Sequence, residues 1–221
     1  MSRAGSPDPA SPHTRRTLWE SPGVSVVDFR CQAHVEPEGA EEPNSTHSIV
    51  FVRRGLFQRA HRGETLLADP NWVLFFNATE AYRYAHPLPG GDDCTILTLA
   101  PAAALELVAR HAPGDADRPE TPFRLGHGLG SPRAAALQYE LLALVERQVP
   151  GLAIEDLLVE LADEALRAAY ASSRRRRARA EPRTAAARRQ RRDLAEAARL
   201  ALNQRLASPP SLGELSRSLG C

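Results

Sequence analysis

The sequence predicts an α+β protein in which a β-barrel precedes a helical hairpin, an arginine-rich linker and a partial all-α module. Short apolar strands separated by turn residues recur at intervals of about ten residues between positions 17 and 99. From Pro101 onward the apolar residues follow helical spacing instead. The charge changes as well, since residues 174–192 carry ten arginines and one acid, whereas residues 1–173 carry fifteen arginines and twenty-three acids.

The predicted barrel spans residues 17–100. Its clearest strands are STHSIVFVR at 45–53 and WVLFF at 72–76, which are rich in β-branched and aromatic residues. Gly55 and the pair Asp69-Pro70 supply turns between strands. Further strands are expected at 24–29, 56–61, 65–68, 81–86 and 94–99. Many short strands with regular turns predict a sandwich or a small barrel.

A helical region is predicted over residues 101–171. Pro101 suits the first turn of a helix, Ser131-Pro132 starts a second helix after a loop at 112–130, and a third helix ends near Tyr170. The two long helices should form an antiparallel hairpin. Its leucines are first explained as domain core, but the hairpin can also serve a homodimer, which we expect. The dimerisation candidates are Leu137, Leu141, Leu144, Leu157, Leu158 and Leu161.

Two polar segments flank these regions. Residues 1–16 are expected to be a disordered tail, and because they lack an apolar core they do not predict a secretory signal. The arginine-rich linker, 172–187, has little apolar content and should not pack. It is interpreted as a solvated tether that also attracts nucleic-acid phosphates without sequence preference.

Composition predicts a cytoplasmic protein that does not enter the membrane. No apolar run approaches the roughly 18 residues that a membrane-spanning helix requires. The three cysteines, Cys31, Cys94 and Cys221, are odd in number and widely spaced. This favours free thiols in a reducing compartment over a disulfide framework.

Residues 188–221 predict two helices joined by a proline turn. The first has apolar residues at helical spacing and ends at Ser208-Pro209-Pro210. In the second, Ser211 and Glu214 form a capping box, and Gly220 ends the helix. The apolar positions of the two helices are Leu194, Ala198, Ala201, Leu202 and Leu206, then Leu212, Leu215 and Leu219.

This helix pair resembles the start of the DNA-binding domain of the AraC/XylS family of bacterial transcription regulators. The residues that carry the resemblance are Leu194, Ala197, Ala198, Leu202, Leu206, Ser211, Leu212, Leu215, Ser216, Leu219, Gly220 and Cys221. Residues 46–97 also resemble the cupin-like sensor half of such regulators, at His47 with its apolar strand, at Asp69-Pro70 and in the loop from His86 to Asp92. The resemblance implies a DNA-binding transcription regulator whose sensor binds a small effector.

The family's recognition helix, which enters the major groove, is absent from residues 188–221. We therefore expect a truncated helix-turn-helix domain and no sequence-specific operator binding. DNA binding, non-specific at most, would use phosphate contacts. The DNA-proximal candidates are Arg188, Arg189, Arg191, Arg192 and Ser211.

The expected effector pocket lies inside the barrel. Its candidate residues are His47, Phe51, Phe76, Tyr82, Tyr84 and His86. The histidines His47, His61 and His86 lack the close H-x-H spacing of a readable metal site, so neither a metal nor another cofactor is expected. The usual catalytic motifs are missing too, so an enzyme is not expected. The alternatives are a metal-dependent cupin-like enzyme and a dominant-negative sensor fragment.

Overall fold

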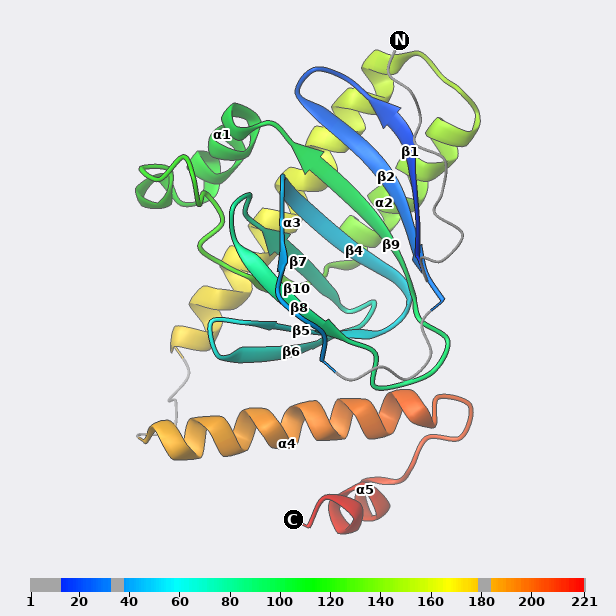
Figure 1. The fold of residues 1–221 in the computed structure, drawn as a ribbon, viewed down its shortest axis with the longest axis vertical. Coiled ribbons are helices and arrows are strands. Elements are labelled where there is room, and N and C mark those ends of the chain that lie inside the picture. Colours follow the sequence, from blue (N-terminus) through cyan, green and yellow to red (C-terminus); the bar gives the residue numbers. More distant parts are fainter. Residues whose placement is uncertain (1–12, 33–37, 179–183, 221) are drawn as a thin grey trace.

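The computed structural model describes residues 13–32, 38–178 and 184–220, and its strands form two antiparallel sheets (Figure 1). The larger sheet has the order β1 (His13–Glu20), β2 (Val24–Cys31), β9 (Asp92–Leu99), β4 (His47–Gly55), β7 (Trp72–Phe76) and β10 (His127–Leu129). The smaller sheet has the order β3 (Glu42–Pro43), β8 (Ala81–Ala85), β5 (Phe57–His61) and β6 (Glu64–Ala68). The two sheets form a β-sandwich.

The larger sheet is buried on both faces, which explains the continuous apolar runs in its strands. On β4, Val50 and Val52 belong to the core between the sheets, whereas Ile49 and Phe51 belong to the core beneath the helices. Successive side chains of a strand point to opposite faces, so one strand contributes to both cores. The run WVLFF in β7 is divided between the two cores in the same way.

Three helices cover the outer face of the larger sheet: α1 (Pro101–His111), α2 (Pro132–Glu146) and α3 (Gly151–Ala178). A 3-10 turn, Pro113–Asp115, follows α1. The Ser131 hydroxyl accepts a hydrogen bond from the Ala134 amide at 3.0 Å and caps α2, as its sequence predicts. The α3 helix crosses β10 closely, because a Cβ on Gly128 would lie 2.3 Å from the Cβ of Ala169.

The leucines offered as dimerisation candidates lie in the core of the single chain. Leu137, Leu141, Leu157, Leu158 and Leu161 are buried against the larger sheet, and Leu144 packs at the edge of that core. A second copy would have to meet the opposite face of the hairpin, where Tyr139 and Leu152 are more than two-thirds exposed. The homodimer itself stays a prediction.

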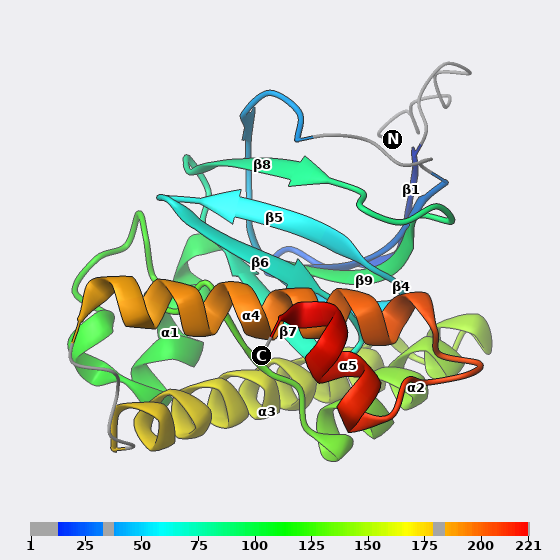
Figure 2. The same ribbon diagram turned by 90° about the horizontal axis from the view of Figure 1, so that it is seen from below.

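The last two helices are α4 (Ala185–Gln204) and α5 (Leu212–Leu219). Their local signals are confirmed: Ser211 and Glu214 form the capping box, and Gly220 adopts the left-handed conformation with φ 71°. The α4 helix lies against the open side of the sandwich, beside β6 (Figure 2). None of the described helices combines the length and the apolar character needed to cross a membrane.

Three boundaries differ from the sequence prediction. β1 begins at His13, inside the expected tail, because its polar residues pair with β2 through the backbone. β10 lies inside the expected loop at 112–130 and is too short to show an alternation of apolar and polar residues. α3 continues through the first part of the expected linker to Ala178, since arginine and alanine are good helix formers. Residues 1–12 of the tail and 179–183 of the linker lie outside the described residues.

Candidate ligand-binding site

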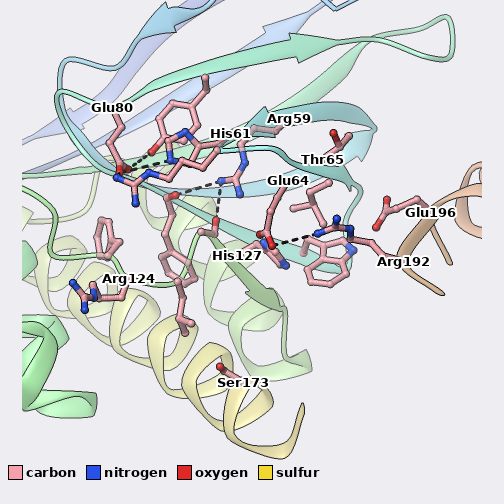
Figure 3. Close-up of a pocket in the computed structure, with 18 of the residues that line it drawn as sticks. Arg59, His61, Glu64, Thr65, Glu80, Arg124, His127, Ser173, Arg192 and Glu196 are labelled. Carbon is pink, nitrogen blue, oxygen red and sulfur yellow. Dashed lines mark hydrogen bonds and ion pairs between the residues drawn. The ribbon is translucent and has the colours of Figure 1, made fainter. Parts of the chain in front are cut away.

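A cavity of about 590 Å³ lies between the open side of the sandwich and helix α4 (Figure 3). Strands β5 to β8, the segment 123–127 and the end of α3 supply most of its wall. The α4 helix closes one side with Arg192, Ala195, Glu196 and Arg199. The cavity is therefore shared between the predicted sensor and the first helix of the predicted DNA-binding module.

Arg59, on β5, is the most deeply buried charge in this cavity, with 5% of its surface exposed. Its Nη1 donates to the carbonyl oxygens of Gly126 at 2.8 Å and Phe75 at 3.4 Å. The guanidinium carbon stands 5.2 Å from the ring centre of Phe76 and 5.6 Å from that of Tyr82. Its buried Nε has no hydrogen-bond partner. Burial lowers the pKa of Arg59, yet an arginine stays protonated in proteins.

Among the arginines that line the cavity, Arg59 is the one for which no ion pair with a described carboxylate is found, although Glu64 and Glu80 act on it from a longer distance. Each of the other arginines lining the cavity has an acidic partner: Arg62 with Glu80, Arg124 with Asp115, Arg192 with Glu64, and Arg199 with both Asp69 and Glu196. A buried charge without a counter-charge is costly. The cavity thus holds a positive charge that an anionic ligand would neutralise.

Glu80 forms the centre of a separate polar network at the cavity wall. Its carboxylate accepts hydrogen bonds from the Tyr82 hydroxyl at 2.8 Å and the Asn77 amide at 2.9 Å, and Arg62 lies 2.7 Å away. Burial alone would raise the pKa of Glu80, but these hydrogen bonds and the Arg62 charge hold that pKa below its ordinary value. Burial and the bond to Glu80 raise the pKa of Tyr82. Glu80 is therefore a charged, fully partnered carboxylate, while Tyr82 remains a neutral donor.

The α4 helix is attached to the sandwich by polar contacts. Glu196 Oε2 accepts a hydrogen bond from the Leu67 amide at 2.8 Å, at the edge strand β6. Arg199 lies 2.7 Å from the buried carboxylate of Asp69, and its guanidinium carbon stands 4.9 Å from the ring centre of Trp72. Glu196, Arg199 and Trp72 line the cavity, so a ligand there would meet residues that hold α4.

The remaining lining residues give the cavity an apolar wall. Phe75 and Phe123 pack together with ring centres 5.5 Å apart, and Leu125 and Leu66 extend this surface. Trp72 closes it toward α4, with its ring 5.0 Å from that of His127. The cavity thus combines a deep cation with aromatic and aliphatic walls, as small-molecule sites commonly do.

Of the six predicted effector-pocket residues, only Tyr82 lines this cavity. Phe51 faces the helices, while Phe76 and Tyr84 belong to the core between the sheets. His47 accepts a hydrogen bond from the Ala78 amide, and burial lowers its pKa. His86 follows the far end of β8. The six residues therefore do not share one pocket, since Phe51 lies on the opposite face of the larger sheet from Phe76.

Sequence reasoning missed Arg59. Its signal was an arginine inside the apolar strand LFQRAH, where a charge would need a special reason.

Among the DNA-proximal candidates, Arg192 turns toward the sandwich and pairs with Glu64 at 3.3 Å. The Ser211 hydroxyl is used in the cap of α5. Arg188, Arg189 and Arg191 are exposed on α4, and their contact with DNA stays a prediction.

Comparisons with known proteins address the fold alone. A scan against protein-family models and a search of curated proteins both give no match. Among solved structures, a cupin superfamily protein of Desulfitobacterium hafniense DCB-2 is 17% identical, covering 39% of this chain and 76% of its own at a TM-score of 0.33. KdgF from Halomonas sp. is 15% identical, and the match covers 42% of this chain and 86% of KdgF at a TM-score of 0.35.

The comparisons also bear on the expectation that this chain is not an enzyme. A Ralstonia eutropha JMP134 protein described as a "putative mannose-6-phosphate isomerase" is 17% identical, with 44% of this chain and 98% of that protein covered at a TM-score of 0.36. The exclusion of an enzyme from missing motifs is therefore wrong, because the fold occurs in a protein so described. At these TM-scores the likeness indicates no ligand or reaction for this chain, and it shows neither the AraC/XylS resemblance nor a helix-turn-helix domain.

Proposed function

We propose that this chain is a ligand-responsive regulator of the AraC/XylS type, whose cupin-like sandwich binds a small organic anion beneath α4. The observation that carries the proposal is Arg59, a buried cation without a carboxylate partner among the described residues, in a cavity that α4 closes. Binding there would neutralise Arg59 and contact α4 at the same time.

The lining selects the chemistry of the ligand. A carboxylate accepts two parallel hydrogen bonds from a guanidinium and so matches the unneutralised charge of Arg59. Phe75, Phe123 and Leu125 favour an aromatic or short aliphatic body attached to that carboxylate. The volume of about 590 Å³ lies within the range of sites for small molecules.

The position of α4 supports a regulatory role for such a ligand. Arg192, Glu196 and Arg199 line the cavity and also hold α4 on the sandwich. A ligand that contacts these side chains binds the docked and undocked states with different affinities, and it shifts the equilibrium between them by that difference. A ligand that binds the docked state more tightly holds α4 on the sandwich, whereas one that binds the undocked state more tightly releases it.

The helix pair α4–α5 supports the DNA-binding part of the proposal. Leu206 and Leu212 are 74% and 83% exposed, the capping box starts α5, and the left-handed Gly220 ends it. Exposed leucines on an amphipathic pair suit packing against further helices of a helix-turn-helix domain. The arginines of 174–192 supply phosphate contacts that weaken steeply with salt.

The test is a thermal-shift and calorimetric comparison of small carboxylates, namely benzoate, phenylacetate and hexanoate, with their neutral amides. We expect at least one carboxylate to bind and its amide to fail. Arg59→Met should weaken that binding about 10–100-fold, because a charge-assisted hydrogen bond is lost. Arg133→Met is the matched control, since Arg133 lies on α2 and outside the cavity. Equal binding of acid and amide, or full binding by Arg59→Met, would contradict the proposal.

A further inference from the structure

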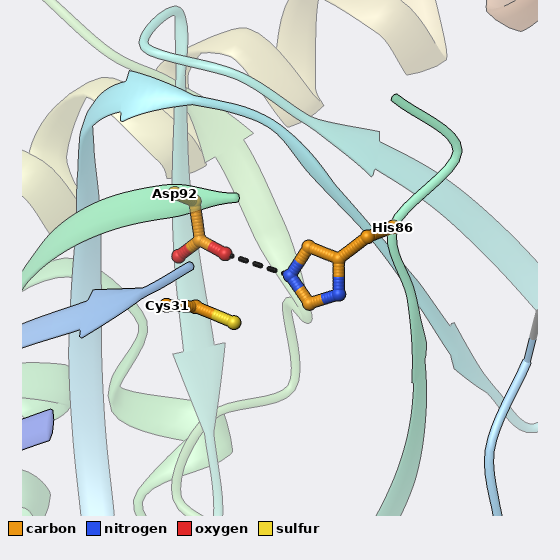
Figure 4. Close-up of side chains that lie close together, drawn as sticks. All are labelled: Cys31, His86 and Asp92. Atoms are coloured by element: carbon orange, nitrogen blue, oxygen red, sulfur yellow. Dashed lines mark hydrogen bonds and ion pairs between the residues drawn. The ribbon is translucent and has the colours of Figure 1, made fainter. Parts of the chain in front are cut away.

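A second cluster of reactive side chains lies outside the cavity and comprises Cys31, His86 and Asp92 (Figure 4). Cys31 ends β2, Asp92 begins β9, and His86 directly follows β8. Cys31 and Asp92 are directly opposite in the antiparallel β2–β9 pair, so their side chains share one face. Cys94, two residues beyond Asp92 on β9, lies on that face too.

The ligand atoms of this cluster are already close together. One atom each from Cys31, His86 and Asp92 lies within 4.8 Å of the others. His86 Nε2 is 3.0 Å from Asp92 Oδ1, and Cys94 Sγ donates to Asp92 Oδ2 at 3.1 Å. Cys31 is 5% exposed and Asp92 2%. A buried carboxylate, an imidazole and a thiol therefore converge from three parts of the chain.

The backbone around the cluster is closely packed and contains glycines with positive φ angles. Gly90 and Gly91, in the loop between His86 and Asp92, have φ of 103° and 61°. A Cβ on Gly55 would lie only 2.0 Å from the Gly91 carbonyl oxygen, so this loop packs directly on the end of β4. Glycine alone adopts these conformations cheaply. The loop thus fixes the spacing of His86 and Asp92, as a preorganised site requires.

The donor set decides which ion would suit the cluster. Thiolate and imidazole ligands favour zinc and similar transition metals, whereas calcium and magnesium prefer oxygen ligands alone. Zinc binds sulfur at about 2.3 Å and nitrogen at about 2.0 Å, so donors around one ion lie roughly 3–4 Å apart. Small side-chain rotations bring atoms from a 4.8 Å cluster to that separation.

We propose that Cys31, His86 and Asp92 bind one divalent transition-metal ion, with Zn²⁺ the best-suited ion. On binding, the Cys31 thiol loses its proton to solvent and its sulfur donates an electron pair to the ion. The hydrogen bond between His86 and Asp92 is broken, and both side chains bind the ion instead. Cys94 acts as a positioning residue, because its hydrogen bond orients the Asp92 carboxylate. The bound ion would tie the β8–β9 loop to the end of β2.

The test uses the full chain, stripped of metal under reducing conditions and titrated with Co²⁺. We expect one Co²⁺ per chain with a thiolate-to-cobalt charge-transfer band, and displacement of Co²⁺ by one equivalent of Zn²⁺. Cys31→Ser should remove the band, and His86→Ala should weaken binding at least 100-fold. Cys94→Ser keeps a hydrogen-bond donor, so it should keep the band with at most the about 10–100-fold loss typical of outer-shell changes.

Cys221→Ser is the matched thiol control and should leave both the band and the stoichiometry unchanged. Circular dichroism of each metal-free variant establishes that it is folded, and Zn²⁺ should raise the thermal midpoint of wild type but not of His86→Ala. The proposal is overturned if Co²⁺ binds without a thiolate band. It is equally overturned if folded Cys31→Ser retains the band, or if Cys221→Ser loses it.

Discussion

The two helical pairs of this chain use similar amphipathic sequences in opposite ways. In α2–α3 the leucines are core residues, and Leu158 and Leu161 are completely buried against the larger sheet. In α4–α5 none of the described residues is buried, and Leu212 is 83% exposed. Helical period alone therefore identified both pairs, but it did not distinguish the pair that builds the fold from the pair that rests on it.

The difference lies in what attaches each pair. The α2–α3 pair is held by apolar burial, at about 25 cal/mol for each Å² removed from water. The α4 helix is held on the sandwich by Glu196, Arg199 and Arg192 through hydrogen bonds and ion pairs. The exposed Arg192–Glu64 pair contributes about 0–1 kcal/mol. In the largely buried Arg199–Asp69 pair, the cost of removing both charges from water offsets much of their attraction. The attachment of α4 is thus the weaker one, and a ligand in the adjoining cavity can change it.

The largest effect should come from truncating one leucine in each pair. Leu158→Ala leaves a cavity in the core and should lower the free energy of unfolding by about 2–5 kcal/mol. Leu212→Ala removes an exposed side chain and should change it by no more than about 0.5 kcal/mol. Urea denaturation followed by circular dichroism measures both. Similar losses from the two substitutions would abolish the distinction between the pairs.

A smaller effect should follow from loosening α4. Arg199→Ala removes the ion pair to Asp69 and the contact with Trp72, so amide hydrogen exchange in 185–204 should become faster. Exchange in the buried part of α3 should not change. Arg189→Ala, at an exposed position of the same helix, is the charge-matched control. If the two variants exchange alike, the Arg199 contacts do not hold the helix.

The smallest effect concerns the pH dependence of the cavity wall. Burial raises the pKa of Glu80, but Asn77, Tyr82 and Arg62 more than offset this, so the folded-state pKa lies below the ordinary 4.5. Its stabilisation is complete above pH 4.5 and is lost as pH falls through the folded-state pKa. Glu80→Gln should therefore destabilise the protein at pH 7, and its difference from wild type should shrink in acid.

Chemical denaturation at several pH values measures this trend, with Glu146→Gln as an exposed control on α2. A Glu80→Gln difference that stays constant from pH 7 to acid would contradict a lowered Glu80 pKa. A difference that grows as pH falls would mean that folding raises the pKa of Glu80 instead of lowering it.

The elements that depend on local chemistry could be predicted from the sequence. The start of α2 follows from Ser131-Pro132, the α5 cap from Ser211 and Glu214, and the strand at 72–76 from its apolar run. Strands that lack an alternation of apolar and polar residues could not be predicted in the same way. β1 is polar and β10 has three residues, and both exist because their backbones complete a neighbouring strand.

The candidate site could hardly be predicted, because its parts are distant in the sequence. Arg59, Phe123 and Arg199 meet only when β5, the segment before β10 and α4 come together. The same holds for Cys31 and His86, which the strand register and the glycine-built loop bring to one end. The types of these residues suggest what chemistry they can do, but only the fold shows that they lie close together.

The central claim is that a ligand in the cavity changes the attachment of α4. The most direct measurement is hydrogen exchange of wild type and Arg59→Met, with and without saturating amounts of the carboxylate that binds best among benzoate, phenylacetate and hexanoate. The account predicts a ligand-dependent change in 185–204 of wild type, no change in the buried part of α3, and no response in Arg59→Met. Protection confined to β5 and β7, with exchange in 185–204 unaltered, would contradict it.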